Sequence, residues 1–442
     1  MSEAAKQDWR KIKLGSLATK LVNGGTPPTD VPYFWQGRYP WITGADFTES
    51  GIGPIRRFVS DDAINQTATN LINRGQLLIV TRTGVGKLAI APTDIAISQD
   101  ITGFYIDGEQ ATVEFLYHRL KLGLGDLKKL NQGTSINGIT RGDLVGYSLE
   151  IPPIPQQRRI ATILTTLDEV IEATEKLVEK HQQIKAGLMH DLFTRGLWTR
   201  PELARGDHQG LPCEATAQPG QLRPAPEEAP GLYQDSPLGP IPKVWEAASL
   251  LSISNSMTNG FVGTATPYYS EDEDAVQYLY GNNVRADKLE LPSSMRVTRR
   301  FHELQRKSQL QPGDMLTVQS GHIGTSAIVP ESLGEANCHA LIITKFKTSR
   351  VVPNFVSYYC NSPGGYQRLG SIFVGSTILH INVKEFKNFA IPLPQDLHEQ
   401  ESICERLVAI NERLDTETTH LAKLRQQKQG LMHDLLTGRV RV

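Results

Sequence analysis

Residues 187–192 read Gly-Leu-Met-His-Asp-Leu, and residues 430–435 repeat the same six residues in the same order. Weaker matches extend the similarity: Gly133-Thr-Ser-Ile136 resembles Gly375-Ser-Thr-Ile378, and Trp9 corresponds to Trp245. The spacing between matched residues drifts slowly, as it does when two copies differ by short loop insertions. The chain therefore contains two copies of one module, and each copy covers about half of the chain.

Length and composition limit what this module can be. The chain has 442 residues, which is too long for one ordinary core and predicts two or three domains. Hydrophobic residues make up 39% and charged residues 21%, which is typical of a folded globular protein. The formal net charge is −1, so the positive potential needed to bind a polyanion must be local or come from a partner.

The sequence predicts no signal peptide, no membrane-spanning helix, no zinc ribbon and no disulfide framework. The first residues are polar, and the longest aliphatic stretches, such as Leu77–Val80, are too short to span a bilayer. The four cysteines are scattered and form no Cys-x-x-Cys pair, which argues against a zinc ribbon or a disulfide framework. We expect a cytoplasmic protein that holds no metal and no cofactor.

Each copy begins with a segment in which short aliphatic runs are broken by Gly, Pro and Asn. Runs that predict strands are Gln76–Thr81, Lys87–Ala91 and Ala340–Lys345. Short helices are expected at equivalent places, over Phe115–Leu120 and Asn354–Tyr359. Proline-rich stretches, Ile151–Pro155 and Ile391–Pro394, close the segment, and proline suits the first turn of a helix. The pattern predicts a compact α+β domain in each copy.

A long helix is predicted after each of these domains. The steps between apolar positions alternate three and four residues, from Ile160 to Leu188 and again from Ile403 to Leu435. This spacing is typical of a coiled-coil seam. The first seam comprises Ile160, Ile163, Leu167, Val170, Thr174, Leu177, His181, Ile184 and Leu188. A two-fold relation between the copies makes the two helices antiparallel.

The predicted fold class is α+β, with two homologous α/β domains separated by two long helices that form an antiparallel coiled coil. The domains are predicted over 1–154 and 241–393, and the helical spacers over 155–195 and 394–442. A linker is predicted over 196–240. It is rich in proline and poor in large apolar residues, so we expect it to be extended on the surface.

This architecture suits recognition of a split DNA sequence. Duplex DNA has two-fold axes that dimeric readers match, and two like domains in one chain can read two unlike half-sites at a fixed spacing. The chain resembles the specificity subunits of Type I restriction–modification systems. The resemblance rests on the Ile-Pro-x-Pro-like stretches, on the closing segments Gly187–Thr194 and Gly430–Gly438, and on Asp235–Trp245 before the second domain.

The resemblance implies two target recognition domains, two spacers and a DNA target with an unread gap. It also implies assembly with two methyltransferase subunits and, for cleavage, with restriction subunits. One alternative is a related system whose partner fuses methylation and cleavage. Another is a coiled-coil scaffold that does not bind DNA.

Candidate DNA-binding residues lie in polar, glycine-bearing loops between strands. Arg suits bidentate pairing with guanine and Asn or Gln with adenine, while Lys, Ser and Thr suit phosphates. In the first copy the candidates are Arg82, Thr83, Lys87, Gln132, Thr134, Ser135 and Asn137. In the second copy they are Gln319, Ser320, His322, Thr325, Ser376, Thr377 and His380. The alternative is that these loops are hairpin turns whose side chains cap their own backbone.

The two copies differ in these loops. Arg82 corresponds to Ser320, Gln132 to Val374, and Asn137 to Leu379. If these residues read bases, the two half-sites differ in sequence.

Motifs for catalysis are not found, and we expect no enzyme activity. The stretch Thr83–Lys87 fails as a phosphate loop because Thr81 replaces the first glycine and Leu88 follows the lysine. The repeated His-Asp pairs lie near helix ends with no nucleophile, so the repeated hexapeptide indicates packing or partner docking. The predicted docking residues are Leu188, Met189, Asp191, Leu431, Met432 and Asp434.

Overall fold

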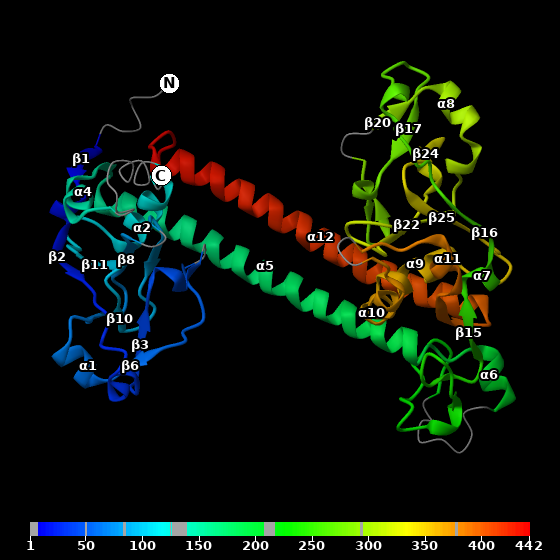
Figure 1. Ribbon diagram of the computed structural model, residues 1–442. Helices are drawn as coiled ribbons and strands as arrows, with labels where there is room; N and C mark the ends of the chain where they lie inside the picture. The colour runs from blue at the N-terminus through cyan, green and yellow to red at the C-terminus, as the bar shows by residue number, and fades with distance from the viewer. Residues whose placement is uncertain are drawn as a thin grey trace. The chain divides into compact units, whose positions relative to one another are not determined.

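The computed structural model describes residues 8–48, 51–82, 85–123, 125, 139–206, 217–291, 295–375 and 379–442. The chain divides into two compact units, which we call unit 1 (residues 1–176 and 418–442) and unit 2 (residues 177–417). Two long helices, α5 (Ile154–Thr194) and α12 (Leu397–Leu436), contribute residues to both units (Figure 1). Each unit therefore holds one copy of the repeated domain together with part of each long helix.

The domain of unit 1 is built on two four-stranded sheets within its described residues. The first sheet is antiparallel, in the order β2 (Ala18–Asn23), β11 (Ile101–Ile106), β8 (Leu77–Val80) and β9 (Leu88–Ile90). The second has the order β6 (Phe58–Val59), β3 (Tyr39–Ile42), β10 (Ile95–Ile97) and β7 (Asn70–Ile72), and β3 and β10 run parallel. A separate pair, β1 (Arg10–Lys13) and β12 (Ser148–Ile151), leads into α5.

Unit 2 repeats this topology strand for strand. Its first sheet has the order β16 (Ser254–Asn259), β25 (Leu341–Phe346), β22 (Met315–Val318) and β23 (Ser326–Ile328). Its second has the order β20 (Met295–Val297), β17 (Val276–Leu279), β24 (Ala336–Cys338) and β21 (Gln309–Leu310), again with one parallel pair, β17 and β24. The pair β15 (Trp245–Ser249) and β26 (Ala390–Pro394) leads into α12. The internal repeat and the α+β class predicted from the sequence are confirmed.

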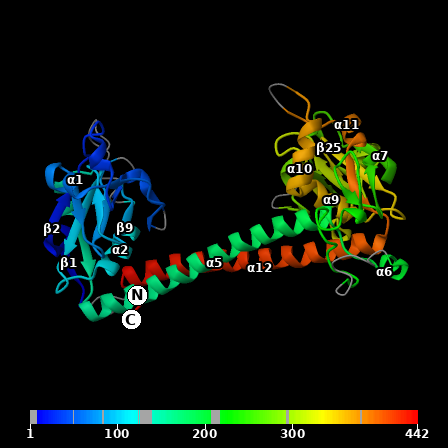
Figure 2. The ribbon, with the colours of Figure 1, turned by 90° about the horizontal axis from the view of Figure 1, so that it is seen from below.

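In each unit, a short helix packs between the first sheet and a long helix. In unit 1, α2 (Val113–Leu122) contributes Phe115 and Leu116 to a buried cluster that also contains Ile160 and Leu164 of α5. In unit 2, α9 (Pro353–Asn361) does the same toward α12, and Figure 2 shows α9 beside these long helices. Each long helix is therefore part of the core of the domain that precedes it.

The two long helices pack against each other in antiparallel directions inside unit 1. Lys428 of α12 contacts Asp168 of α5, and Arg425 Nη2 lies 2.7 Å from Glu175 Oε1, so residue numbers rise along one helix as they fall along the other. Ile171, Leu421 and Leu424 form a buried cluster between them. The predicted antiparallel pairing of the helices is confirmed.

The predicted seam of α5 is wrong at four positions. Ile163, Val170, Leu177 and Ile184 are 38%, 41%, 37% and 46% exposed, whereas their neighbours Leu164 and Ile171 are buried. The sequence places two adjacent aliphatic residues at several of these steps, and either one satisfies a three-four alternation. Packing against α2 selects Leu164, and packing against α12 selects Ile171.

The segment predicted as a linker over 196–240 is not extended on the surface over its described residues, 196–206 and 217–240. It contains α6 (Arg200–Arg205), and Arg223 is fully buried. Its guanidinium binds Glu202 at 2.5 Å and Glu399 of α12 at 2.6 Å. This buried ion network, together with the buried side chains of Leu197, Trp198 and Tyr233, holds the segment against the rest of unit 2, and composition alone does not reveal it. Over the described part of the chain, no helix combines the length and apolarity needed to cross a membrane.

Candidate nucleic-acid interface

The first candidate loop is closed by equivalent backbone hydrogen bonds in the two units. In unit 1, Gly86 N donates to Val80 O at 3.0 Å; in unit 2, Gly324 N donates to Val318 O at 2.9 Å. These glycines have φ angles of +89° and +83°, a left-handed conformation that residues with a Cβ rarely adopt. The turn geometry therefore explains why both copies keep glycine here while neighbouring residues differ.

In each unit a residue just after the second candidate loop is hydrogen-bonded to the first loop. Ile139 N donates to Thr81 O at 2.8 Å, and at the equivalent place Ile381 N donates to Gln319 O at 3.1 Å. In unit 2 the loop narrows to paired backbone bonds of 2.9 Å between Val374 and His380. The backbone just after the second loop thus lies beside the first loop in each unit.

Three of the predicted DNA-binding side chains already bind the protein backbone. Lys87 Nζ donates to Phe47 O at 2.9 Å and to Gly44 O at 3.3 Å. His322 Nε2 lies 3.1 Å from Val284 O, and Gln319 Nε2 donates to Ile381 O at 3.1 Å. These side chains bind carbonyls of other segments rather than the backbone of their own turn, which the hairpin-turn alternative had them cap.

Other predicted side chains face solvent. Arg82, Ser320 and His380 are exposed, and Thr325 is half-buried. They are available to a ligand at the tip of each loop. The remaining candidates, Thr83, Gln132, Thr134, Ser135, Asn137, Ser376 and Thr377, lie outside the described residues.

A cationic cluster beside the first loop of unit 1 was missed by the sequence analysis. Asp46 is buried, and Arg56 Nη2 lies 2.5 Å from its Oδ1, while Arg57 Nη2 lies 3.4 Å from its Oδ2. Arg57 also stacks over the Trp41 ring at 4.4 Å. Burial acts to raise the pKa of Asp46, but hydrogen bonds from Arg56 and Thr43 outweigh it and hold this pKa below its usual value.

This cluster lies next to Lys87, because Lys87 binds the same turn, Gly44–Phe47. In unit 2 the corresponding turn carries neutral Asn283 in place of Asp46, with its Oδ1 accepting from Tyr280 N at 2.8 Å. The adjacent residues Arg56 and Arg57 were a visible signal in the sequence. They were overlooked because they precede a strand rather than form a glycine-bearing turn.

The repeated hexapeptide mainly packs in the core. In unit 2, Met189 is buried, Leu188 packs on the same cluster, and Asp191 lies 3.5 Å from Arg195. In unit 1, Met432 packs on the core and Asp434 is half-buried, whereas Leu431 is exposed. The repetition of the motif is therefore explained largely by its packing in two equivalent places.

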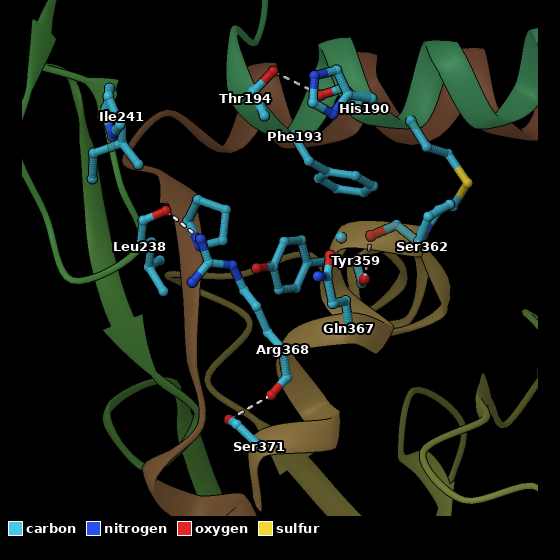
Figure 3. Close-up of a pocket in the computed structure, with 15 residues that line it drawn as sticks. His190, Phe193, Thr194, Leu238, Ile241, Tyr359, Ser362, Gln367, Arg368 and Ser371 are labelled. Carbon is cyan, nitrogen blue, oxygen red and sulfur yellow. Dashed lines mark hydrogen bonds between the residues drawn. The ribbon is translucent and has the colours of Figure 1, made fainter.

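One end of this motif lines a cavity of about 600 Å³ in unit 2. Figure 3 shows His190, Phe193 and Thr194 of α5 on one side and Tyr359, Gln367 and Arg368 on the other. The Phe193 and Tyr359 rings meet edge to face at 5.4 Å, and Arg368 donates to Leu238 O. Among the side chains that the structure describes, no group of three could hold a metal ion.

Comparison with known proteins gives a consistent result. A family model described as the Type I restriction modification DNA specificity domain matches residues 6–185 and 245–426. The MjaVIII specificity subunit of a Type I restriction enzyme from Methanocaldococcus jannaschii is 22% identical, over 99% of this chain and 94% of that protein. The EcoR124I/EcoR124II specificity subunit from Escherichia coli is 25% identical over 40% of this chain and 45% of that protein.

The fold is also shared with a solved structure. The S subunit of a Type I restriction–modification system from M. genitalium superimposes with a TM-score of 0.60, at 14% identity, over 98% of each chain. At this identity the likeness concerns the fold alone.

Proposed function

The chain belongs to the Type I restriction–modification DNA specificity family, and from this premise we propose that it directs partner enzymes to an asymmetric, two-part DNA sequence. The observation that carries the proposal is that the two units share the same backbone fold but differ in the exposed residues of their loops. The same backbone bond joins the two loops in each unit, through Thr81 and Ile139 or through Gln319 and Ile381. The exposed residue next to it is Arg82 in one unit and Ser320 in the other.

In this proposal, residues 1–154 and 241–393 are the two target recognition domains, and residues 155–195 and 394–442 are the spacers. Arg82 pairs with a guanine in one half-site, and Ser320 and His380 contact the other. Arg56 and Arg57 add positive charge beside the first loop, which helps to hold a phosphate backbone although the net charge of the whole chain is near zero.

Catalysis is assigned to the partners, which are two methyltransferase subunits and, in the cleaving complex, restriction subunits. We place this assembly in the cytoplasm. The relatives described above are named as specificity subunits of Type I restriction enzymes, and this supports the same kinds of partner for this chain.

The exposed aliphatic side chains of α5 support a docking surface for the methyltransferase subunits. Unit 1 presents Ile163 and Val170, and unit 2 presents Leu177 and Ile184; each pair is spaced by one heptad. Such spacing fits a partner helix that packs along α5. Equivalent positions of α12 are polar: Arg406, Arg413, His420 and Gln427. One pair in each unit accommodates two partner subunits.

Methylome sequencing tests the function directly. Cells that carry this chain with its methyltransferase are expected to show methylated bases in a motif with two unlike half-sites and one fixed gap. Methylation of a continuous palindrome, or no new methylated motif, would overturn the proposal. A scaffold without a DNA role would also leave a duplex unshifted when the methyltransferase is present.

A further inference from the structure

Two glutamines occupy equivalent, fully buried positions in the first turns of the long helices. Gln157 lies on α5. Its Oε1 accepts from Thr112 N at 3.0 Å, and its Nε2 donates to Pro152 O at 2.8 Å and Gln110 O at 3.3 Å. Thr112 is the residue that caps α2, and Pro152 directly follows β12.

Gln400 on α12 makes the same three bonds in unit 2. Its Oε1 accepts from Val352 N at 2.8 Å, and its Nε2 donates to Pro394 O at 2.8 Å and Arg350 O at 3.1 Å. Val352 precedes α9, and Pro394 ends β26. Each amide therefore ties the last strand of its domain, the segment before the short helix and the start of the long helix to one another.

These bonds constrain geometry more than the surrounding apolar contacts do. A buried cluster such as that of Ile160 and Phe115 tolerates small rotations by repacking. An amide hydrogen bond is directional, and a rotation or slide of the helix leaves a buried carbonyl or N–H without a partner. The glutamine therefore fixes the direction in which each long helix leaves its domain.

We propose that Gln157 and Gln400 are positioning residues that set which gap between the two half-sites is accepted. The inference rests on the proposed function, since a gap exists only for a split target. Neither glutamine belongs to the candidate DNA loops. Their loss is therefore expected to change the tolerance for gap length and to leave the preferred bases within each half-site unchanged.

The test uses the full complex of this chain with its methyltransferase subunits. Gln157→Met and Gln400→Met keep the side-chain size and remove all three bonds. Gln156→Met is the matched control, because Gln156 is adjacent and only half-buried. Methyl transfer is measured on duplexes that keep both half-sites and vary the gap by one or two base pairs. The rate ratio between the preferred gap and its neighbours is expected to fall about tenfold in each variant, the size expected if roughly one of the three lost hydrogen bonds distinguishes the preferred gap from its neighbours.

The ratio is taken within each folded complex, so a lower folding yield does not affect it. Gln157→Glu is a second variant that keeps an acceptor for Thr112 N but has at most one proton to donate, where the amide donates to two carbonyls. It is expected to relax the gap as Gln157→Met does. An unchanged ratio in these variants, or a change in base preference as large as that in gap preference, overturns the inference. A wild-type complex that methylates no split target would instead overturn the proposed function.

Discussion

Single side chains in the candidate DNA loops divide by what they already bind. Lys87 and Gln319 are half-buried and bind backbone carbonyls, as exposed His322 also does, and Arg82 and Ser320 are exposed. The positions of the loops were predictable, because glycines and polar residues between aliphatic runs are a local signal. The role of each side chain was not, because its partner is a carbonyl tens of residues away in the sequence.

His118 is a buried residue of α2 with a strongly perturbed pKa. Its Nε2 lies 3.3 Å from Thr165 Oγ1, and its Nδ1 lies 3.9 Å from Asp168 Oδ2. Burial lowers the pKa of His118 to about 4, and the nearby Asp168 carboxylate opposes this shift only in part. His118 is therefore neutral where α2 packs on α5.

This pKa predicts that unit 1 loses stability in mild acid. The unfolded chain binds a proton at His118 below about pH 6.5, while the folded chain does not do so until about pH 4. The free energy of unfolding therefore falls as pH drops through this window, by about 2 kcal/mol at pH 5 relative to pH 7.5. Urea unfolding of wild type and His118→Gln at both pH values measures the effect. Equal pH dependence in the two proteins would contradict it.

The long helices α5 and α12 show that periodicity predicts the presence of a helix better than it predicts which face of the helix is buried. The two long helices follow from three-four spacing and proline-led starts. The buried face of α5 depends on α2 and α12, which select Leu164 and Ile171 over Ile163 and Val170. Composition and periodicity do not single out Gln157 and Gln400, because a glutamine near a helix start is usually exposed. A comparison of the two copies at matched positions was the one available indication.

The exposed face of α5 predicts a specific loss of partner. In Ile163→Glu/Val170→Glu, two apolar contacts of unit 1 are replaced by charges, while the free chain keeps its core because both side chains are already exposed. One methyltransferase subunit should dissociate and the other remain, which native mass spectrometry resolves. The control is Thr162→Glu/Glu169→Gln, at exposed positions beside the pair. Retention of both methyltransferase subunits in the double variant would contradict the docking proposal.

The segment between the copies predicts a large stability effect at Arg223. Arg223→Ala leaves the buried carboxylates of Glu202 and Glu399 without their cation and is expected to cost about 3–5 kcal/mol in unit 2. Trp198 and Trp245 lie beside this network, so fluorescence-detected urea unfolding reports on it. Arg200→Ala, at an exposed position, serves as the control. A loss below about 1 kcal/mol, the range of surface pairs, would show that the network is dispensable.

The whole molecule contains the same domain fold twice, with different side chains in the loops of the two copies. The sheet orders of both units agree, and so do the glycine turns and the bond between the loops. This level was largely predictable, because the duplication is written in the sequence. The adjacent residues Arg56 and Arg57 are visible in the sequence, but their pairing with buried Asp46 is not, because only the fold brings Asp46 beside them.

The central claim is that each unit reads its own half-site, and paired methylomes test it most directly. Methylated motifs are compared for wild type, Arg82→Ala and Ser320→Ala, each in cells with the methyltransferase. Arg82→Ala is expected to relax one position in one half-site, at a cost of about 1–3 kcal/mol, and to leave the other half unchanged. Ser320→Ala is expected to affect only the other half. Equal relaxation of both half-sites by either variant would contradict modular recognition.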